Sequence, residues 1–239
     1  MFGNQIESFI EFCDNYQIAD EGLHMVTGNG CQYHPVFIVL LYSDTRFDHI
    51  AEKFVKGQEY WHASIGFGPA LSSLYSFNFG EAEANKIKGG LSYESMDFYK
   101  REHPTGDCYV GCVFLTQYRY QKLRDTLNYY IKNKAKTRYS FINLLYSLFG
   151  KVKTSKKNLN LVCSTFVDTI LKSVNVDLSN KPTNLVKPDD LKGTNNEKQF
   201  DVFKGKIKDY DAMNASKIVE RMANDKAYSY FKKSPNDTK

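Results

Sequence analysis

Cys163 and His62, about a hundred residues apart, are the two side chains whose positions most directly suggest chemistry. Cys163 begins a stretch in which Phe166, Ile170 and Val174 recur at four-residue spacing, which predicts an amphipathic helix starting at the cysteine. The first turn of a helix has unpaired N–H groups and a partial positive charge, which favour a thiolate and can bind an oxyanion. We therefore expect Cys163 to be a nucleophile, the alternative being a small buried residue.

His62 lies in residues 60–67, YWHASIGF, whose composition predicts a β-strand. Alternation places Trp61 and Ile65 on one face and leaves His62 with Ser64 and a glycine on the other, which is small and polar enough to receive a helix N-terminus. An imidazole there can take the proton of a thiol. The alternative is a structural histidine bonded to a neighbouring carbonyl group.

The remaining four histidines are weaker candidates. His24 and His103 are expected in loops, His34 precedes a proline, and His49 lies on an expected helix. None has the spacing of a metal site. We expect neither a metal nor an organic cofactor.

A cysteine–histidine pair usually has a third group that fixes the tautomer and orientation of the imidazole. The strand at 74–79 is expected to supply it. A three- or five-residue turn before that strand would place Ser76 and Asn78 on the face of His62, whereas a two- or four-residue turn would present Ser73, Tyr75 and Phe77. We favour Ser76, with Asn78 second, and either would make a neutral hydrogen bond.

The pattern of the whole chain predicts an α+β fold with an antiparallel sheet and helices packed on it. The expected strands are 36–42, 60–67, 74–79, 90–96 and 108–115, with a hairpin over 199–210 turning at Lys204–Gly205. The expected helices are 4–19, 44–56, 116–131, 141–149, 163–174 and 214–227. This divides the chain into an extension (1–33), a main domain (34–212) and a C-terminal helix with a polar tail (213–239).

Composition excludes some functions. Hydrophobic residues make up 42% of the 239, enough for a packed core, and the net charge of +5 comes from scattered lysines rather than a continuous basic face. We therefore expect no nucleic acid partner. The longest apolar run, 36–42, is too short to span a bilayer, and the first residues lack a signal-peptide pattern. These features predict cytoplasmic synthesis and no membrane partner.

The five cysteines contain no pair spaced for metal binding. Cys108 and Cys112 share one face of a predicted strand but lie too far apart for a disulfide, so we interpret them as small buried residues. Reduced thiols agree with synthesis in the cytosol.

Three short motifs carry a resemblance over roughly residues 35–210. Trp-His-Ala-Ser-Ile, a turn and Leu-Tyr-Ser-Phe are followed by Cys-Ser-x-Phe-Val-x-x-Ile-Leu and then by a Pro-Asp segment at 184–191. This order, with histidine before cysteine, resembles the circularly permuted papain-like cysteine hydrolases. These are kin to NlpC-type peptidases and to the lecithin–retinol acyltransferase group, and similar sequences occur in bacteriophages and Gram-positive bacteria.

The resemblance implies a permuted papain-like fold and a peptidase or amidase that works through an acyl-enzyme. Cys163 would be the nucleophile, His62 the general base and then acid, and Ser76 the orienting group. Substrates would be peptides, proteins or peptidoglycan, including phage structural proteins cut during particle maturation. One alternative is a catalytically inert papain-like module in a virion. Another is lipid acyl transfer, which the polar segment 207–239 disfavours.

Overall fold

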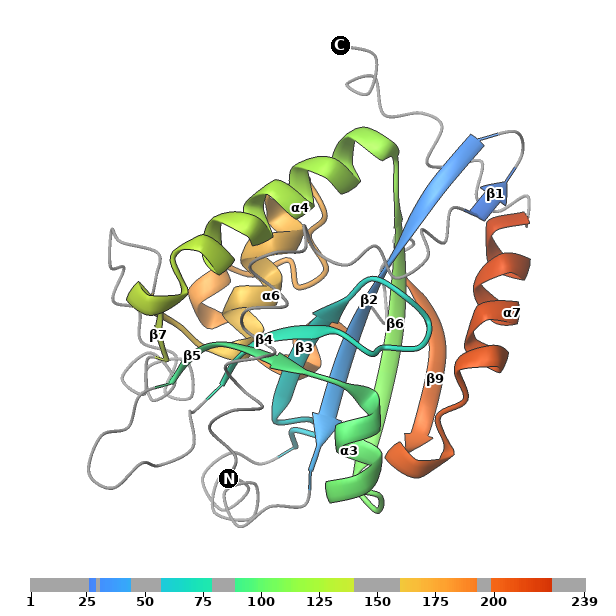
Figure 1. The fold of residues 1–239 in the computed structure, drawn as a ribbon, viewed down its shortest axis with the longest axis horizontal. Helices are drawn as coiled ribbons and strands as arrows, with labels where there is room; N and C mark the ends of the chain where they lie inside the picture. The colour runs from blue at the N-terminus through green and yellow to red at the C-terminus, as the bar shows by residue number, and fades with distance from the viewer. Residues whose placement is uncertain are drawn as a thin grey trace.

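The structure is a computed structural model that describes residues 26–28, 31–43, 57–78, 89–139, 160–192 and 199–224 (Figure 1). The helices expected at 4–19, 44–56 and 141–149 lie outside the described residues. So do most of the 1–33 extension and the chain from residue 225 onward.

An antiparallel sheet forms the centre of the molecule. Its six strands follow the spatial order β5-β4-β3-β2-β6-β9. Their bounds are β2 (Cys31–Tyr42), β3 (His62–Gly66), β4 (Leu74–Asn78), β5 (Gly90–Glu94), β6 (Asp107–Leu115) and β9 (Phe200–Lys206). A short β1 (Val26–Gly28) pairs with the start of β2, and β7 (Arg138–Tyr139) forms a separate parallel pair with β8 (Asn160–Leu161).

Four helices accompany the sheet in the described part of the chain, which confirms the α+β class. They are α3 (Met96–Glu102), α4 (Gln117–Lys132), α6 (Cys163–Lys172) and α7 (Ala212–Asn224). Short 3₁₀ turns are η1 (Lys134–Lys136), η2 (Thr183–Leu185), η3 (Pro188–Leu191) and η4 (Ile207–Asp209). The helices α4 and α6 lie side by side over one face of the sheet, while α3 and α7 pack on the other (Figure 1).

Strand β2 separates the two cores because its side chains alternate between them. Ile38 and its alternate neighbours pack with the apolar stripe of α6, whereas Val39 and its alternate neighbours pack toward α3 and α7. Both residues are fully buried. The sequence expectation that this strand is buried on both faces is confirmed, because its run of β-branched and aromatic residues offers apolar side chains to each face.

The expected hairpin at 199–210 is wrong. Residues 200–206 form the single strand β9, and Gly205 pairs with Cys108 instead of turning the chain. Residues 107–112 of β6 pair with β9 across one register shift at Val110 and Gly111, and this pairing outweighs the local turn tendency of Lys204–Gly205.

Sequence reasoning also missed α3, which directly follows β5. Ser95 caps this helix by accepting a hydrogen bond from the N–H of Phe98 at 3.1 Å, and the backbone N–H of Met96 donates to Leu71 in the β3–β4 turn at 2.9 Å. Two turns of helix are too short to produce a clear apolar period, so only their packing reveals them.

Candidate active site

His62 is the first residue of β3, next to the central strand. It pairs with Leu41 of β2, and the preceding N–H of Trp61 donates to the carbonyl oxygen of Leu41 at 2.9 Å. These bonds hold the backbone of His62 against the middle of the sheet. Its side chain is 15% exposed, so the imidazole sits at the boundary between core and solvent.

Glu94 ends β5 and directs its carboxylate to His62. Oε2 accepts from Nε2 of His62 at 2.9 Å and from the hydroxyl group of Ser64 at 2.8 Å, while Oε1 accepts from Ser76 at 2.6 Å and from Asn78 at 3.2 Å. The glutamate side chain is only 5% exposed. Four donors therefore satisfy a buried carboxylate, which is the requirement for keeping it ionised.

The bond to Glu94 determines what the imidazole can do. An ionised carboxylate accepts only, so Nε2 of His62 carries the proton in this pair. In the neutral ring, Nδ1 is then the acceptor and is the nitrogen left to receive a proton from a thiol.

Cys163 begins α6 and faces this imidazole. The helix is held down by its buried stripe, which includes Phe166 and Ile170. The sulfur lies 3.9 Å from the carbonyl oxygen of Trp61, the residue before His62, and the interaction with Cys163 is among the causes that raise the pKa of His62. The structure thus brings together the two residues that the sequence pattern singled out. Cys163 itself is 5% exposed.

Electrostatics favour a charged His62–Glu94 pair. Burial alone would lower the pKa of His62, but the negative charge of Glu94 and hydrogen bonds to Cys163 and Glu94 raise it well above 6.5. Burial alone would raise the pKa of Glu94, but the charge of His62 and hydrogen bonds from His62, Ser76 and Ser64 lower it to about 2. Mutual attraction outweighs desolvation for both groups.

The group that hydrogen-bonds the imidazole is the carboxylate of Glu94, whereas the sequence analysis favoured the neutral hydroxyl group of Ser76 for this place. Ser76 and Asn78 do lie on the face of His62. Ile65 pairs with Tyr75, so the even-numbered residues of β3 and of β4 share one face of the sheet. Both side chains, however, donate hydrogen bonds to Glu94, which itself holds the imidazole. Sequence reasoning missed Glu94 because nothing local in the sequence shows that β5 lies beside β4. The only signal was that Glu94 lies on a polar face of the strand expected at 90–96.

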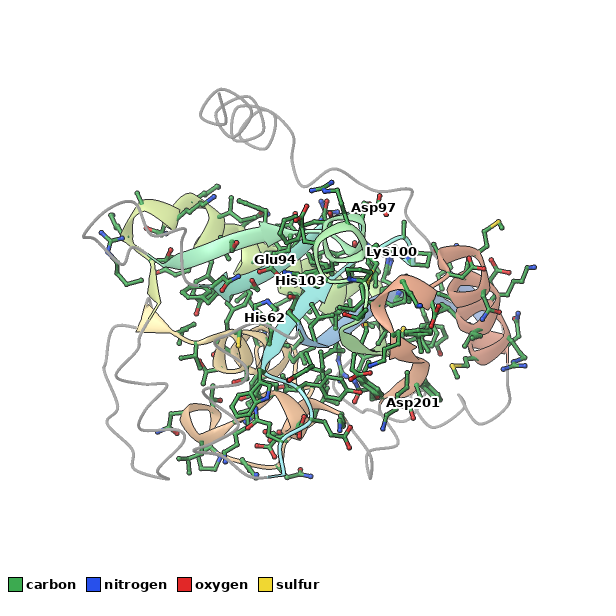
Figure 2. All side chains as sticks on the ribbon, turned by 90° about the horizontal axis from the view of Figure 1, so that it is seen from below. His62, Glu94, Asp97, Lys100, His103 and Asp201 are labelled. Atoms are coloured by element: carbon green, nitrogen blue, oxygen red, sulfur yellow. The ribbon has the colours of Figure 1, made fainter. Side chains whose placement is uncertain are left out.

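Tyr99 of α3 closes the other side of the carboxylate. It is 4% exposed, its ring centroid lies 6.4 Å from that of His62, and its hydroxyl group hydrogen-bonds to Glu94. Burial, followed by the nearby charge of Glu94, raises the pKa of Tyr99 well above 10. The phenol therefore stays protonated as a donor. Figure 2 shows His62 and Glu94 close together, with α3 nearby.

The other described thiols are structural. Cys108 and Cys112 are free, are fully buried in β6, and have pKa values raised by burial. They face the core shared with α3 and α7. The interpretation of both as small buried residues is confirmed.

The histidines outside the site have other surroundings. His34 is buried and stacks on Tyr120 with ring centroids 4.3 Å apart, and His103 ends α3 beside the ring of Tyr99. His24 and His49 lie outside the described residues. Within the described ranges, no three His, Cys, Asp or Glu side chains gather as metal ligands would.

Comparison of the chain with protein-family models, with curated proteins and with solved structures found no match. The site thus rests on its own geometry. In the part of the chain that the structure describes, no helix has both the length and the apolar character needed to cross a bilayer.

Proposed function

We propose that this protein is a cysteine-nucleophile hydrolase in which Cys163, His62 and Glu94 form the catalytic triad. One observation carries the proposal: the sulfur of Cys163 lies 3.9 Å from the carbonyl oxygen of the residue before His62, and Nε2 of that histidine is held at 2.9 Å by a buried carboxylate. This is the arrangement by which an orienting group presents a base to a nucleophile.

Before acylation, Nδ1 of His62 already holds the proton of the Cys163 thiol, so the nucleophile is a thiolate beside the imidazolium. The thiolate then attacks the carbonyl carbon of an amide. The oxyanion forms beside the first turn of α6, where the backbone N–H groups of Cys163 and Ser164 point outward from the helix start. The imidazolium then protonates the leaving amine, and the carbon–nitrogen bond breaks. Glu94 stays ionised and stabilises the imidazolium throughout.

In the second half, the acyl group is held as a thioester on Cys163. His62 has returned to the neutral form by protonating the amine, so it can accept a proton from water as the water attacks the thioester. Collapse of this intermediate releases the carboxylic acid and restores the Cys163 thiolate beside the His62 imidazolium. The cycle needs no metal or organic cofactor.

The chain order supports a permuted papain-like fold for this site. The strand histidine precedes the helix cysteine in the chain, as the motif resemblance implies, and Glu94 on β5 comes between them in sequence. On that basis the substrate is an amide in a peptide, a protein or peptidoglycan, with phage structural proteins among the candidates.

One observation favours a second candidate, a catalytically inert module that binds a partner in a virion. Cys163 is 5% exposed, so little of the nucleophile meets solvent directly. A module of this kind would keep the triad geometry as a structural network.

The deciding experiment is labelling with a thiol-reactive acyl probe, followed by intact-mass measurement and peptide mapping. We expect wild type to be acylated at Cys163 at pH 7 and Cys163→Ala to lose that adduct. His62→Ala should fold normally yet react at least about a hundredfold more slowly, because general-base catalysis contributes about 10²–10⁴-fold.

Cys108 and Cys112 serve as internal controls, because buried thiols in the same chain should stay unmodified until it unfolds. If wild type and Cys163→Ala are labelled alike, the enzyme assignment is wrong and the inert module is favoured. Incubation with peptidoglycan, phage capsid protein and phospholipid vesicles then ranks substrates, and release of lyso-lipid alone would move the assignment to lipid acyl transfer.

A further inference from the structure

A short segment, residues 186–192, makes hydrogen bonds both to α6, which carries Cys163, and to the residues just before β3, which carries His62. We call it the brace. At its start, the carbonyl oxygen of Val186 accepts a hydrogen bond at 2.7 Å from the hydroxyl group of Ser164, the residue after the nucleophile. Val186 is fully buried, so this end of the brace is fixed to the first turn of α6.

The other side of the brace holds the backbone that leads into His62. The two carboxylate oxygens of Asp189 accept separate hydrogen bonds, one from the N–H of Glu59 at 2.7 Å and one from the N–H of Tyr60 at 3.0 Å. Both residues lie before β3, where the described sheet pairing does not include their N–H groups. The carboxylate thus replaces strand partners two and three residues before the imidazole.

Lys192 ties the end of the brace to the same backbone. Its ammonium group lies 2.6 Å from a carboxylate oxygen of Glu59 and 4.6 Å from the centroid of the Tyr60 ring. Its carbonyl oxygen accepts from the hydroxyl group of Tyr109 on β6 at 3.0 Å. The ammonium group also lies 3.9 Å from Oδ1 of Asp189, whereas the bond from Tyr109 anchors the end of the brace to the sheet without involving Asp189.

We propose that Asp189 is a positioning residue that sets the separation between the Cys163 sulfur and the His62 imidazole. The inference rests on the proposed function. The sulfur lies 3.9 Å from the carbonyl oxygen of Trp61, the single residue between Asp189-bound Tyr60 and His62. A shift of the 59–61 backbone therefore moves the base relative to the nucleophile, whereas α6 stays fixed through Ser164.

The test compares Asp189→Asn with Asp190→Asn. The asparagine at 189 is nearly isosteric but replaces one acceptor oxygen with an NH₂ donor, so one of the two backbone N–H groups loses its partner. Asp190 lies in the same turn and accepts from the N–H of Lys187 at 3.0 Å while pairing with Lys181 at 2.7 Å. It is a matched control because its bonds to Lys187 and Lys181 do not reach the backbone before His62.

We expect Asp189→Asn to slow acyl-probe labelling of Cys163 at pH 7 by about tenfold to a hundredfold, since a displacement of about 1 Å can cost a hundredfold. Asp190→Asn should label within about twofold of wild type at a similar thermal midpoint. In a His62→Ala background, adding Asp189→Asn should change the rate by less than about twofold, because a residue acting through the imidazole has nothing left to position.

The outcomes separate the two proposals. If wild type is no faster than His62→Ala, the proposed function fails and this inference with it. If wild type depends on His62 but Asp189→Asn matches Asp190→Asn, only the positioning role is overturned. An Asp189→Asn effect that persists at full size without His62 would mark Asp189 as merely structural.

Discussion

Replacing Glu94 by glutamine is the sharpest perturbation of the site, because it removes one buried charge at almost constant volume. Lowering the pKa of Glu94 from 4.5 to about 2 corresponds to about 3 kcal/mol in favour of the ionised carboxylate, at about 1.36 kcal/mol per pKa unit. The carboxylate is 5% exposed, so solvent screens little of this free energy.

The sign of the pH dependence follows from both partners. The lowered pKa of Glu94 contributes stability that is present above about pH 4.5 and is lost as pH falls toward 2. The raised pKa of His62 contributes stability that is fully present below about pH 6.5 and is lost as pH rises through the folded-state value. Wild type should therefore exceed Glu94→Gln most between about pH 4.5 and 6.5.

The assay is urea unfolding of wild type and Glu94→Gln at several pH values. We expect the difference in unfolding free energy to reach about 3 kcal/mol in that window and to shrink as pH falls from 4.5 toward 2. Glu102→Gln is the control, because Glu102 pairs with Arg101 on the surface and its loss should cost less than about 1 kcal/mol. A difference that stays constant across the whole pH range would refute an ionised Glu94 paired with His62.

Two further substitutions test the surroundings of the triad. Ser76→Ala removes the 2.6 Å bond to Glu94 and should lower the free energy of unfolding by about 1.5–3 kcal/mol. It should slow Cys163 labelling less than Glu94→Gln does, because the charge of Glu94 remains. Equal slowing by the two substitutions would contradict this ranking. Phe166→Ala removes a fully buried ring whose centroid lies 4.9 Å from that of Phe77. Chemical denaturation should show that the free energy of unfolding falls by about 3–5 kcal/mol. A fall of less than about 1 kcal/mol would mean that this contact does not hold α6.

The local pattern of the chain predicts much of the machinery. The four-residue recurrence beginning at Phe166 predicts a helix that starts at Cys163, and period-two alternation places His62 on the polar face of β3. The same alternation puts Ser76 and Asn78 on that face once the turn length is odd. These features depend on residues within one or two turns of each other, so the sequence carries them directly.

Non-local pairing decided the features that sequence reasoning missed. Glu94 reaches His62 because β5 lies beside β4 and β4 beside β3, and no local signal specifies that order. Gly205 continues a strand because Cys108 of β6 pairs with it, although Lys204–Gly205 by itself resembles a turn.

The sequence by itself therefore predicted the two candidate residues, the elements that carry them and the α+β class, because side-chain periodicity records which face of an element is buried. Only the tertiary structure decided that a carboxylate completes the site and that Asp189 spans its two halves. The physical reason is distance along the chain: Glu94 and Asp189 are far in sequence from the groups they bind, and only packing of strand on strand and of η3 on the lead-in to β3 brings them within hydrogen-bonding reach.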